Sequence, residues 1–194
     1  MLQPRYLLHT GEGDRFGEAV HHIDVYAFDS LGIYRKMFRD KGAHLKNGYR
    51  MPIDLPEGKW TLLCLGGKVG DYEIGIFKTG IPQQFSPAVS PGITTLSDFR
   101  VKAYFEQKEN LEYSLGELFF GRLDSVEITA DNGGTGVVDL MKNTNKIEVR
   151  VKGIADGSSA RITSDNGRFN SENVTPADAG TIIYVPYYSA SQAD

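Results

Sequence analysis

Residues 55–67 read LPEGKWTLLCLGG, an apolar run with a turn signal at each end. Pro56 and Gly58 favour a turn before the run, and the pair 66–67 favours another after it. Side chains of an extended chain alternate between its two faces. One face would carry Thr61, Leu63 and Leu65, and the other would carry Leu62 and Cys64. This alternation predicts a buried β-strand in which Trp60, the only tryptophan, packs inside the protein.

Alternation with a period of two residues recurs along the rest of the chain, as expected for β-strands. It is found in the segments 21–29, 98–107, 125–131, 137–142 and 145–153. The turn at 30–32 predicts a hairpin between the first of these segments and residues 32–38. The glycine-rich turn 132–136 predicts a second hairpin between its two neighbours. Short strands joined by such turns predict an all-β protein, an antiparallel sandwich or barrel.

Two segments interrupt this pattern. Residues 79–97 contain three of the eight prolines, which predicts a long irregular connection over the surface. Residues 109–118 are compatible with a short helical turn.

The composition changes after Gly153, where IADGSSA is typical of a linker. The 154–194 segment has two clear strands, too little for an independent core. We therefore expect an N-terminal domain over 1–153, followed by a C-terminal segment. The strands of that segment either join the first sheet system or begin a second, incomplete unit.

The composition argues against several functions. The net charge is −4 and the Lys and Arg residues are scattered, so no nucleic-acid partner is expected. One cysteine cannot form an internal disulfide, and four dispersed histidines show no zinc spacing. No apolar run approaches the ~20 residues that span a bilayer, and the first 14 residues do not resemble a signal peptide.

The stretch that defines the fold also holds the best candidates for chemistry. Cys64 is flanked by leucines rather than by a base or a cation, so we expect a buried structural thiol. The glycine pair resembles a phosphate loop only in its glycine content, because Lys68 is followed by Val69 instead of Ser or Thr. A strand-ending turn is the better interpretation.

No metal site is predicted either. His21 and His22 are adjacent in an extended segment and point to opposite faces. Asp29, Asp131 and Asp165 lie in turns, where Asp is favoured for its local hydrogen bonds. Calcium would need six or more converging oxygens. We therefore expect no catalytic, cofactor-binding or metal-binding residues, and a protein that is not an enzyme.

The order of the segments is more informative than any one residue. The series runs DRFGEAVHHIDVYAFDSLGIYRKMF, LPEGKWTLLCLGG, LGELFFGRLDSVEI, GVVDLMKNTNKIEVRVKG, ARITSDNGRFNSENV and IIYVPYY. It resembles the fimbrillin-associated anchor and minor-subunit family of Gram-negative gut and oral anaerobes, over residues 14–188. This resemblance implies an antiparallel transthyretin-like β-sandwich at the cell surface, attached to the outer membrane and acting in fimbria assembly and adhesion.

Two features depart from that family. Its members carry a lipidated cysteine at the mature N-terminus, and residues 1–6 contain none. Attachment to a membrane is therefore expected only through an N-terminal lipid anchor that this chain lacks. Members also usually have a full C-terminal sandwich, whereas this chain ends at Asp194.

The resemblance implies two functional hypotheses. The first is a fimbrial anchor or minor subunit that joins other fimbrial subunits by β-strand complementation, with an adhesion target on a host or bacterial surface. Its candidate edges are the segment before Ile23 and residues 181–188, where Pro186 would limit pairing. The alternative is a glycan- or protein-binding module at the cell surface, in which tyrosines and the 79–97 loop form the site.

Overall fold

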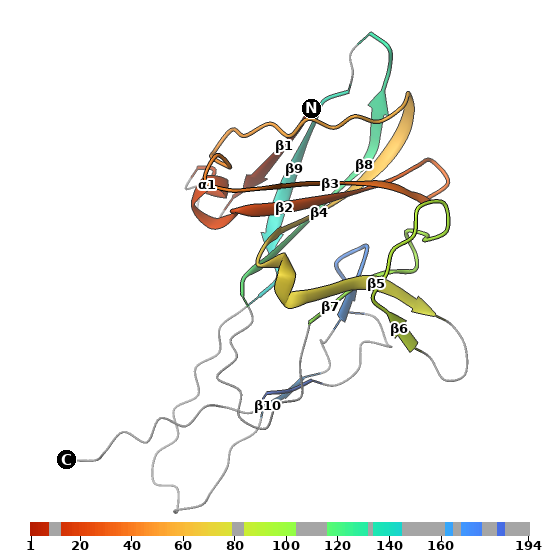
Figure 1. The fold of residues 1–194 in the computed structure, drawn as a ribbon. Coiled ribbons are helices and arrows are strands. Elements are labelled where there is room, and N and C mark those ends of the chain that lie inside the picture. Colours follow the sequence, from red (N-terminus) through yellow and green to blue (C-terminus); the bar gives the residue numbers. More distant parts are fainter. Residues whose placement is uncertain are drawn as a thin grey trace, which may run out of the picture.

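The computed structural model shows an all-β protein with two packed sheets (Figure 1). It describes residues 1–7, 13–78, 84–103, 116–131, 134–144, 162–164, 168–175 and 182–184. The strands are β1 (Leu2–Tyr6), β2 (His22–Phe28), β3 (Tyr34–Lys41), β4 (Gly58–Gly67), β5 (Tyr72–Lys78), β6 (Gln84–Ser86), β7 (Phe99–Ala103), β8 (Leu118–Ile128), β9 (Gly136–Lys142), β10 (Ile162–Ser164), β11 (Arg168–Asn170) and β12 (Ile182–Tyr184). Two short helices are α1 (Phe16–Ala19) and η1 (Val69–Asp71). Neither of these is long or apolar enough to cross a membrane, and the described residues contain no other helix.

The larger sheet has six strands in the order β1-β9-β8-β4-β2-β3. Its neighbours are antiparallel except β1 and β9, which run parallel. A second sheet has the order β11-β7-β5-β6, and β10 pairs with β12. The sheet of β5, β6 and β7 lies below the larger sheet in Figure 1.

One apolar core fills the space between these two sheets. Residues of β4 on this side, Leu63 and Leu65, are fully buried. Phe99 of β7 meets two aromatic rings of β2 edge-on, at centroid distances of 5.2 Å from Tyr26 and 5.8 Å from Phe28. Aromatic pairs favour such edge-to-face geometry, so these contacts fix how the sheets pack.

A second core lies on the opposite face of the larger sheet. Trp60, Leu62 and Cys64 of β4 point into it. It is covered by α1 and by the irregular segment 42–57, which passes above the sheet in Figure 1. Both faces of β4 are therefore buried.

Several predictions made from the sequence are confirmed. The expected strand in 55–67 is β4, with its side chains divided between the faces as predicted. The expected hairpin over 21–38 is formed by β2 and β3. The expected pair around 132–136 is β8 and β9, which run antiparallel. Together with β7, which buries every second residue, they confirm an all-β antiparallel sandwich.

Other predictions fall outside the described residues. They are the strand at 145–153, most of the helical turn at 109–118, and the proposed domain boundary after Gly153. From the 154–194 segment, β11 pairs with β7 and β12 pairs with β10. The division into 1–153 and 154–194 stays a prediction.

The prediction for 79–97 was wrong in one respect, because the short strand β6 pairs with β5 inside it. A bare glycine in β5 allows this close approach. A Cβ on Gly75 would lie 2.0 Å from the carbonyl oxygen of Ser86, so a larger residue would force the two strands apart.

Two of the elements that the alternation did not reveal are β1 and α1. Asp14 links them, because its Oδ1 accepts the N–H of Tyr6 and the N–H of Phe16, both at 2.9 Å. Phe16 is then fully buried in the second core, between the larger sheet and the segment 42–57. A four-residue helix is too short to show a helical period in the sequence.

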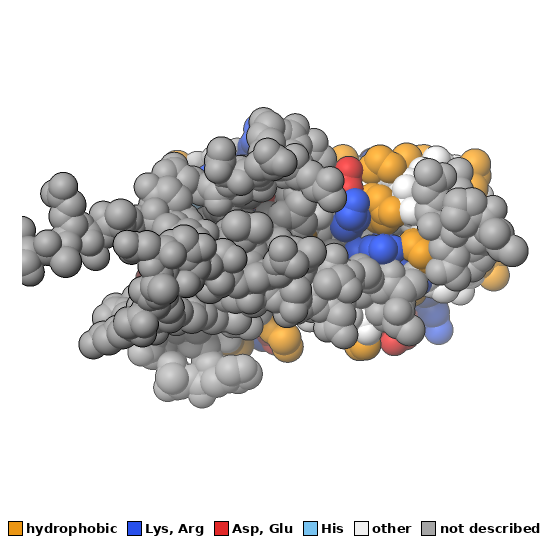
Figure 2. Space-filling model, turned by 90° about the horizontal axis from the view of Figure 1, so that it is seen from below, with side chains coloured by type: hydrophobic (Ala, Val, Ile, Leu, Met, Phe, Trp, Pro, Cys, Tyr) orange, Lys and Arg blue, Asp and Glu red, His pale blue; other side chains and the backbone are white. Residues whose placement is uncertain are grey.

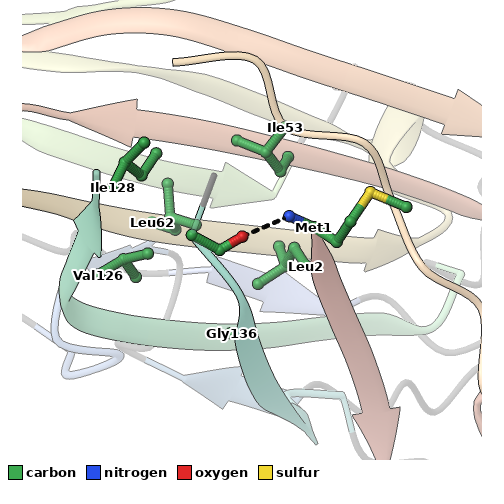
Figure 3. Close-up of a pocket in the computed structure, with 8 residues that line it drawn as sticks. Met1, Leu2, Ile53, Leu62, Val126, Ile128 and Gly136 are labelled. Carbon is green, nitrogen blue, oxygen red and sulfur yellow. Dashed lines mark hydrogen bonds between the residues drawn. The ribbon is translucent and has the colours of Figure 1, made fainter. Parts of the chain in front are cut away.

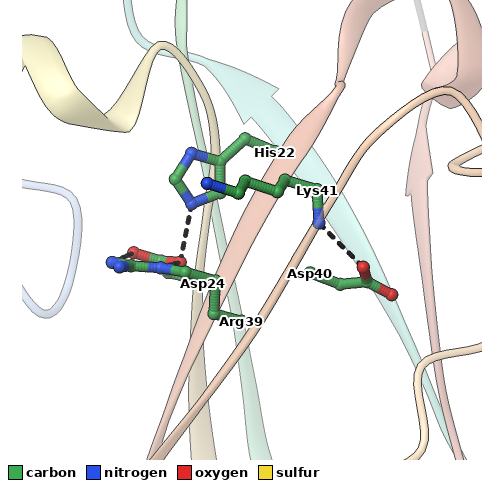
Figure 4. A network of polar contacts seen from close by, with 5 residues as sticks. All are labelled: His22, Asp24, Arg39, Asp40 and Lys41. Carbon is green, nitrogen blue, oxygen red and sulfur yellow. Dashed lines mark hydrogen bonds and ion pairs between the residues drawn. The ribbon is translucent and has the colours of Figure 1, made fainter.

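A buried carboxylate joins β2 to β3. Asp24 is completely buried, and its two oxygens accept the Nε and Nη2 of Arg39, each at 2.7 Å. His22 Nε2 lies 2.9 Å from Asp24 Oδ1, so Arg39 and His22 both point at this carboxylate (Figure 4). A buried charge is tolerated because it is paired and hydrogen-bonded.

Removing the cation should therefore destabilise the fold. We expect Arg39→Ala to lower the free energy of unfolding by about 3 kcal/mol, because the buried Asp24 carboxylate loses both of its hydrogen bonds to the guanidinium. The matched control is Arg5→Ala, which breaks the exposed pair with Asp139 and should cost less than about 1 kcal/mol. Urea denaturation measures both. Equal losses would contradict this role of Arg39.

Candidate functional site

The candidate site begins at the turn between β2 and β3, which Asp29 organises. Its Oδ1 accepts the N–H of Leu31 at 2.9 Å and the N–H of Ile33 at 3.0 Å. Its Oδ2 accepts Arg35 Nε at 2.6 Å. Burial alone would raise the pKa of Asp29, but these hydrogen bonds outweigh it and hold the pKa below its ordinary value. One carboxylate thus orders the whole turn.

A second loop is fastened to this turn by backbone hydrogen bonds. Tyr34 N–H donates to Thr94 O, and Gly92 N–H donates to Tyr34 O, both at 2.8 Å. Leu96 N–H donates to Gly32 O, also at 2.8 Å. The buried Thr94 then closes its own loop by accepting Ser90 N–H at its hydroxyl. The two loops therefore form one ordered end of the sandwich, which we call the hairpin end (residues 29–35 and 90–96).

An open groove lies beside the hairpin end, with a volume of about 630 Å³. It is lined by Asp29, Arg35, Lys36, Asp54, Leu55, Pro56 and Trp60. One wall comes from the turn and β3, and the other comes from the covering segment. Lys36 Nζ bridges the walls, because it donates to the carbonyl oxygen of Asp54 at 3.1 Å.

The groove combines charged groups with a small apolar surface. The side chain of Asp54 is 98% exposed, and Arg35 is 46% exposed, so both have hydrogen-bonding capacity left for a ligand. Trp60 is only 7% exposed and its Nε1 donates to Pro56 O at 3.0 Å. Its ring therefore supports the groove from below and offers little face for stacking.

The outer edge of β1 is closed to a further strand. Leu2 exchanges two backbone hydrogen bonds with Met51, and Tyr6 receives one from Arg15 while its own N–H is bound by Asp14. Between them, Pro4 has no N–H to donate. The start of β1 is also fixed on the β9 side, because the terminal ammonium of Met1 donates to Gly134 O beside a small apolar cavity (Figure 3).

The outer edge of β3 is different. Gly42 N–H bonds to His21 O, so the antiparallel alternation directs the N–H groups of Met37 and Arg39 away from β2. Lys41 N–H, which follows the same pattern, binds the side chain of Asp40. Among the described residues, none forms a backbone hydrogen bond with the outer side of Met37 or Arg39.

The residues singled out from the sequence near β4 have structural roles. Cys64 is fully buried, and this burial raises the pKa of its thiol. Gly67 ends β4 with a φ of +90°, a backbone conformation that favours glycine. Lys68 N–H then donates to Glu117 O, and the chain turns into η1. These positions match the interpretation of a buried thiol and a strand-ending turn.

The histidines and aspartates that the sequence analysis considered as metal ligands lie apart in the structure. His22 is directed at Asp24, while His21 lies just before β2 and is exposed. Asp29 and Asp131 lie in turns, and Asp165 is outside the described residues. Within the described part of the chain, no three His, Cys, Asp or Glu side chains gather as metal ligands would.

The outer face of the second sheet mixes aromatic rings and cations. Lys102 Nζ lies 5.3 Å above the ring of Phe85, and Arg168 lies 4.8 Å above the ring of Phe77. Lys102 also pairs with Glu73 at 3.1 Å. Seen from below, hydrophobic side chains and Lys or Arg side chains accordingly lie next to one another (Figure 2). These two cations therefore cover part of the aromatic surface on this face of the sheet.

The fold is shared with solved proteins from Bacteroides and Porphyromonas species. A candidate polysaccharide-binding protein from Bacteroides thetaiotaomicron superposes with a TM-score of 0.72 at 18% identity, over 99% of this chain and 66% of that chain. A candidate adhesin from Bacteroides ovatus gives 0.71 at 25% identity, over 96% and 62%. The fimbrial anchor protein Mfa2 from Porphyromonas gingivalis gives 0.59 at 15% identity, over 97% and 73%.

The two packed sheets thus place the chain in the class of β-sandwich proteins. All 194 residues match the sequence profile of the fimbrillin-A associated anchor proteins Mfa1 and Mfa2, and the chain belongs to this family. A comparison with curated proteins gives no match. The chain spans less than two thirds of the Bacteroides thetaiotaomicron and Bacteroides ovatus chains with which it was superposed.

The order of the hairpin end should depend on pH through Asp29. Its pKa is lower in the folded protein than the ordinary 3.8, so the unfolded chain binds its proton at higher pH. The stabilisation is therefore present above about pH 4 and is lost as the pH falls through the folded pKa. We expect Asp29→Asn to flatten the dependence of unfolding free energy on pH between 5 and 3. A variant curve parallel to the wild type would contradict this.

Proposed function

We propose that this chain is a cell-surface anchor or accessory subunit of a fimbria, which joins a neighbouring subunit by β-strand addition at the outer edge of β3. Membership of the anchor family supports a fimbrial accessory or surface-binding role. The single observation that favours this edge is the outward backbone of Met37 and Arg39, which no described residue engages. Attachment to the outer membrane is part of the proposal, through a lipid that residues 1–6 do not themselves carry.

Strand addition requires free backbone groups on an ordered edge. β3 is ordered along its length by its register with β2 and by the buried Asp24–Arg39 pair. The opposite edge of the same sheet, at β1, offers no comparable row of donors. An incoming strand would therefore extend the six-stranded sheet beyond β3, and alternate side chains would set its register.

The side chains along β3 would shape the choice of partner. Arg35, Lys36 and Arg39 are already paired with Asp29, Asp54 and Asp24. Unpaired cations on an edge strand discourage non-specific pairing, but these charges are largely neutralised within the protein. An added strand with uncharged or mixed side chains would meet little repulsion.

A backbone substitution tests strand addition directly. We expect Met37→Pro to weaken binding to purified fimbrial subunits of the same organism by at least tenfold, because proline removes an outward N–H without removing a hydrogen bond to β2. Met37→Ala is the matched control, since it loses the same side-chain packing and keeps the N–H. Surface plasmon resonance with purified subunits gives the affinities. The proposal fails if both variants bind equally well while remaining folded.

A second candidate function is glycan binding in the groove. Hydroxyl groups are well matched by an exposed carboxylate and a guanidinium such as Asp54 and Arg35, with Pro56 as an apolar contact. The structural relative from Bacteroides thetaiotaomicron is itself a candidate polysaccharide-binding protein. This function would place the ligand on the groove rather than on the strand edge.

A glycan array separates the two candidates. If the groove binds glycans, the wild-type chain should show saturable binding that Asp54→Ala reduces at least fivefold, because the exposed carboxylate is the most accessible acceptor there. A change at Tyr72 of β5, which does not line the groove, should leave such binding intact. An array without saturable binding would remove this candidate.

A further inference from the structure

The two most exposed large apolar side chains of the described residues lie in the two joined loops of the hairpin end. Leu31 is 81% exposed and Ile93 is 73% exposed. Their two loops are joined by the backbone hydrogen bonds that connect Gly32 with Leu96 and Tyr34 with Gly92. Turn positions normally favour Gly, Pro, Asn, Asp and Ser, so two large aliphatic residues there are not explained by local structure.

Both side chains are held by an ordered frame. Beside Leu31, Gly32 has a φ of +72°, and beside Ile93, Gly92 has a φ of +78°. The Asp29 carboxylate binds the backbone of the first turn, including the Leu31 N–H. Val89 and Leu96 pack against the inter-sheet core on either side of the second loop. The protein therefore presents these aliphatic groups without the entropy cost of ordering them on contact.

We propose that Leu31 and Ile93 form an apolar tip that inserts into a concave apolar pocket of a partner protein. This inference rests on the proposed function in one respect, because it takes the partner protein to be another fimbrial subunit. Apolar anchors surrounded by a polar rim are typical of interface hot spots. Here the rim is supplied by Ser30, Ser90 and the Asp29–Arg35 pair.

The charges at the hairpin end favour a protein over a lipid surface. Within residues 29–35 and 90–96 the only cation is Arg35, and it is bound to Asp29. Segments that insert into anionic membranes carry several cations around their apolar groups. A neutral rim gives no such attraction, whereas it fits the polar border of a protein pocket.

The size of the tip argues against pairing with a second copy. A stable interface buries about 1,200–2,000 Å² in total. Two tips meeting each other would bury on the order of 400 Å² of aliphatic surface. A convex tip gains much more when a concave pocket surrounds each side chain, so the partner must supply the pocket.

The first test uses photo-crosslinking in cells that make the full protein. A photoreactive phenylalanine analogue placed at residue 31 or 93 should crosslink to the same fimbrial subunit. The analogue at Val174, which is 54% exposed and lies outside the tip, is the control and should not crosslink to that subunit. Absence of a common partner at 31 and 93 would overturn the proposal.

The second test measures affinity with the purified subunit found by crosslinking. The double change Leu31→Ser and Ile93→Ser should weaken binding about 100-fold, about tenfold for each aliphatic group. Val174→Ser should bind as the wild type does. Both changes are at exposed sites and should leave unfolding unaffected, which circular dichroism checks. Unchanged affinity of the double variant would contradict the role of the tip.

Further measurements test whether the tip binds a membrane or a second copy instead, and separate tip insertion from strand addition at β3. Flotation with vesicles of phosphatidylethanolamine and phosphatidylglycerol that depends on Leu31 would favour a membrane instead. Self-association that the double variant abolishes would favour a second copy. Strand addition and tip insertion can also fail separately, because Met37→Pro affects only the first and the double serine change only the second.

Discussion

The fold depends on a single strand that has no face toward water. β4 runs through the middle of the six-stranded sheet, and its side chains divide between two separate cores, with Leu63 and Leu65 facing the second sheet and Leu62 and Cys64 facing the covering segment. A polar residue at any of these positions would need a hydrogen-bonding partner in an apolar interior. The two cores must therefore form together, and the elements that cover them, the second sheet on one side and residues 42–57 on the other, are obligatory parts of one structure.

The strands could be predicted because alternation and turn signals are local properties of the sequence. The division of β4 between two faces follows directly from its period of two, and the hairpin of β2 and β3 follows from the turn at 30–32. Other elements depend on distant partners. β1 is only five residues long and gains its place by pairing with β9, more than 130 residues away, and β6 requires the bare backbone of Gly75. No local sequence pattern predicts contacts with such distant partners.

The same distinction applies to the candidate site. The turn chemistry of Asp29 was predictable, and so was the burial of Trp60 and Cys64, because each depends on its own segment. The groove was not predictable, since it forms where β3 meets the covering segment through the contact of Lys36 with Asp54. The one available signal was Leu31, an aliphatic residue in a turn. Turn residues give no measure of their own exposure, and the second loop that carries Ile93 is bonded to this turn only in the folded protein.

The two edges of the large sheet illustrate how a β protein controls association. An exposed edge invites indiscriminate pairing, and β1 avoids this by using Met51, Pro4 and Asp14 to occupy or remove every outward N–H group. β3 instead keeps outward N–H groups, while three of its four cations, Arg35, Lys36 and Arg39, are bound to carboxylates of its own chain. An edge defended by free charge would repel most strands, whereas an edge with internally paired charge rejects few of them on electrostatic grounds. In the proposed strand addition, selectivity at β3 must then come from shape, and the proposed apolar tip at the end of the same hairpin is positioned to supply it.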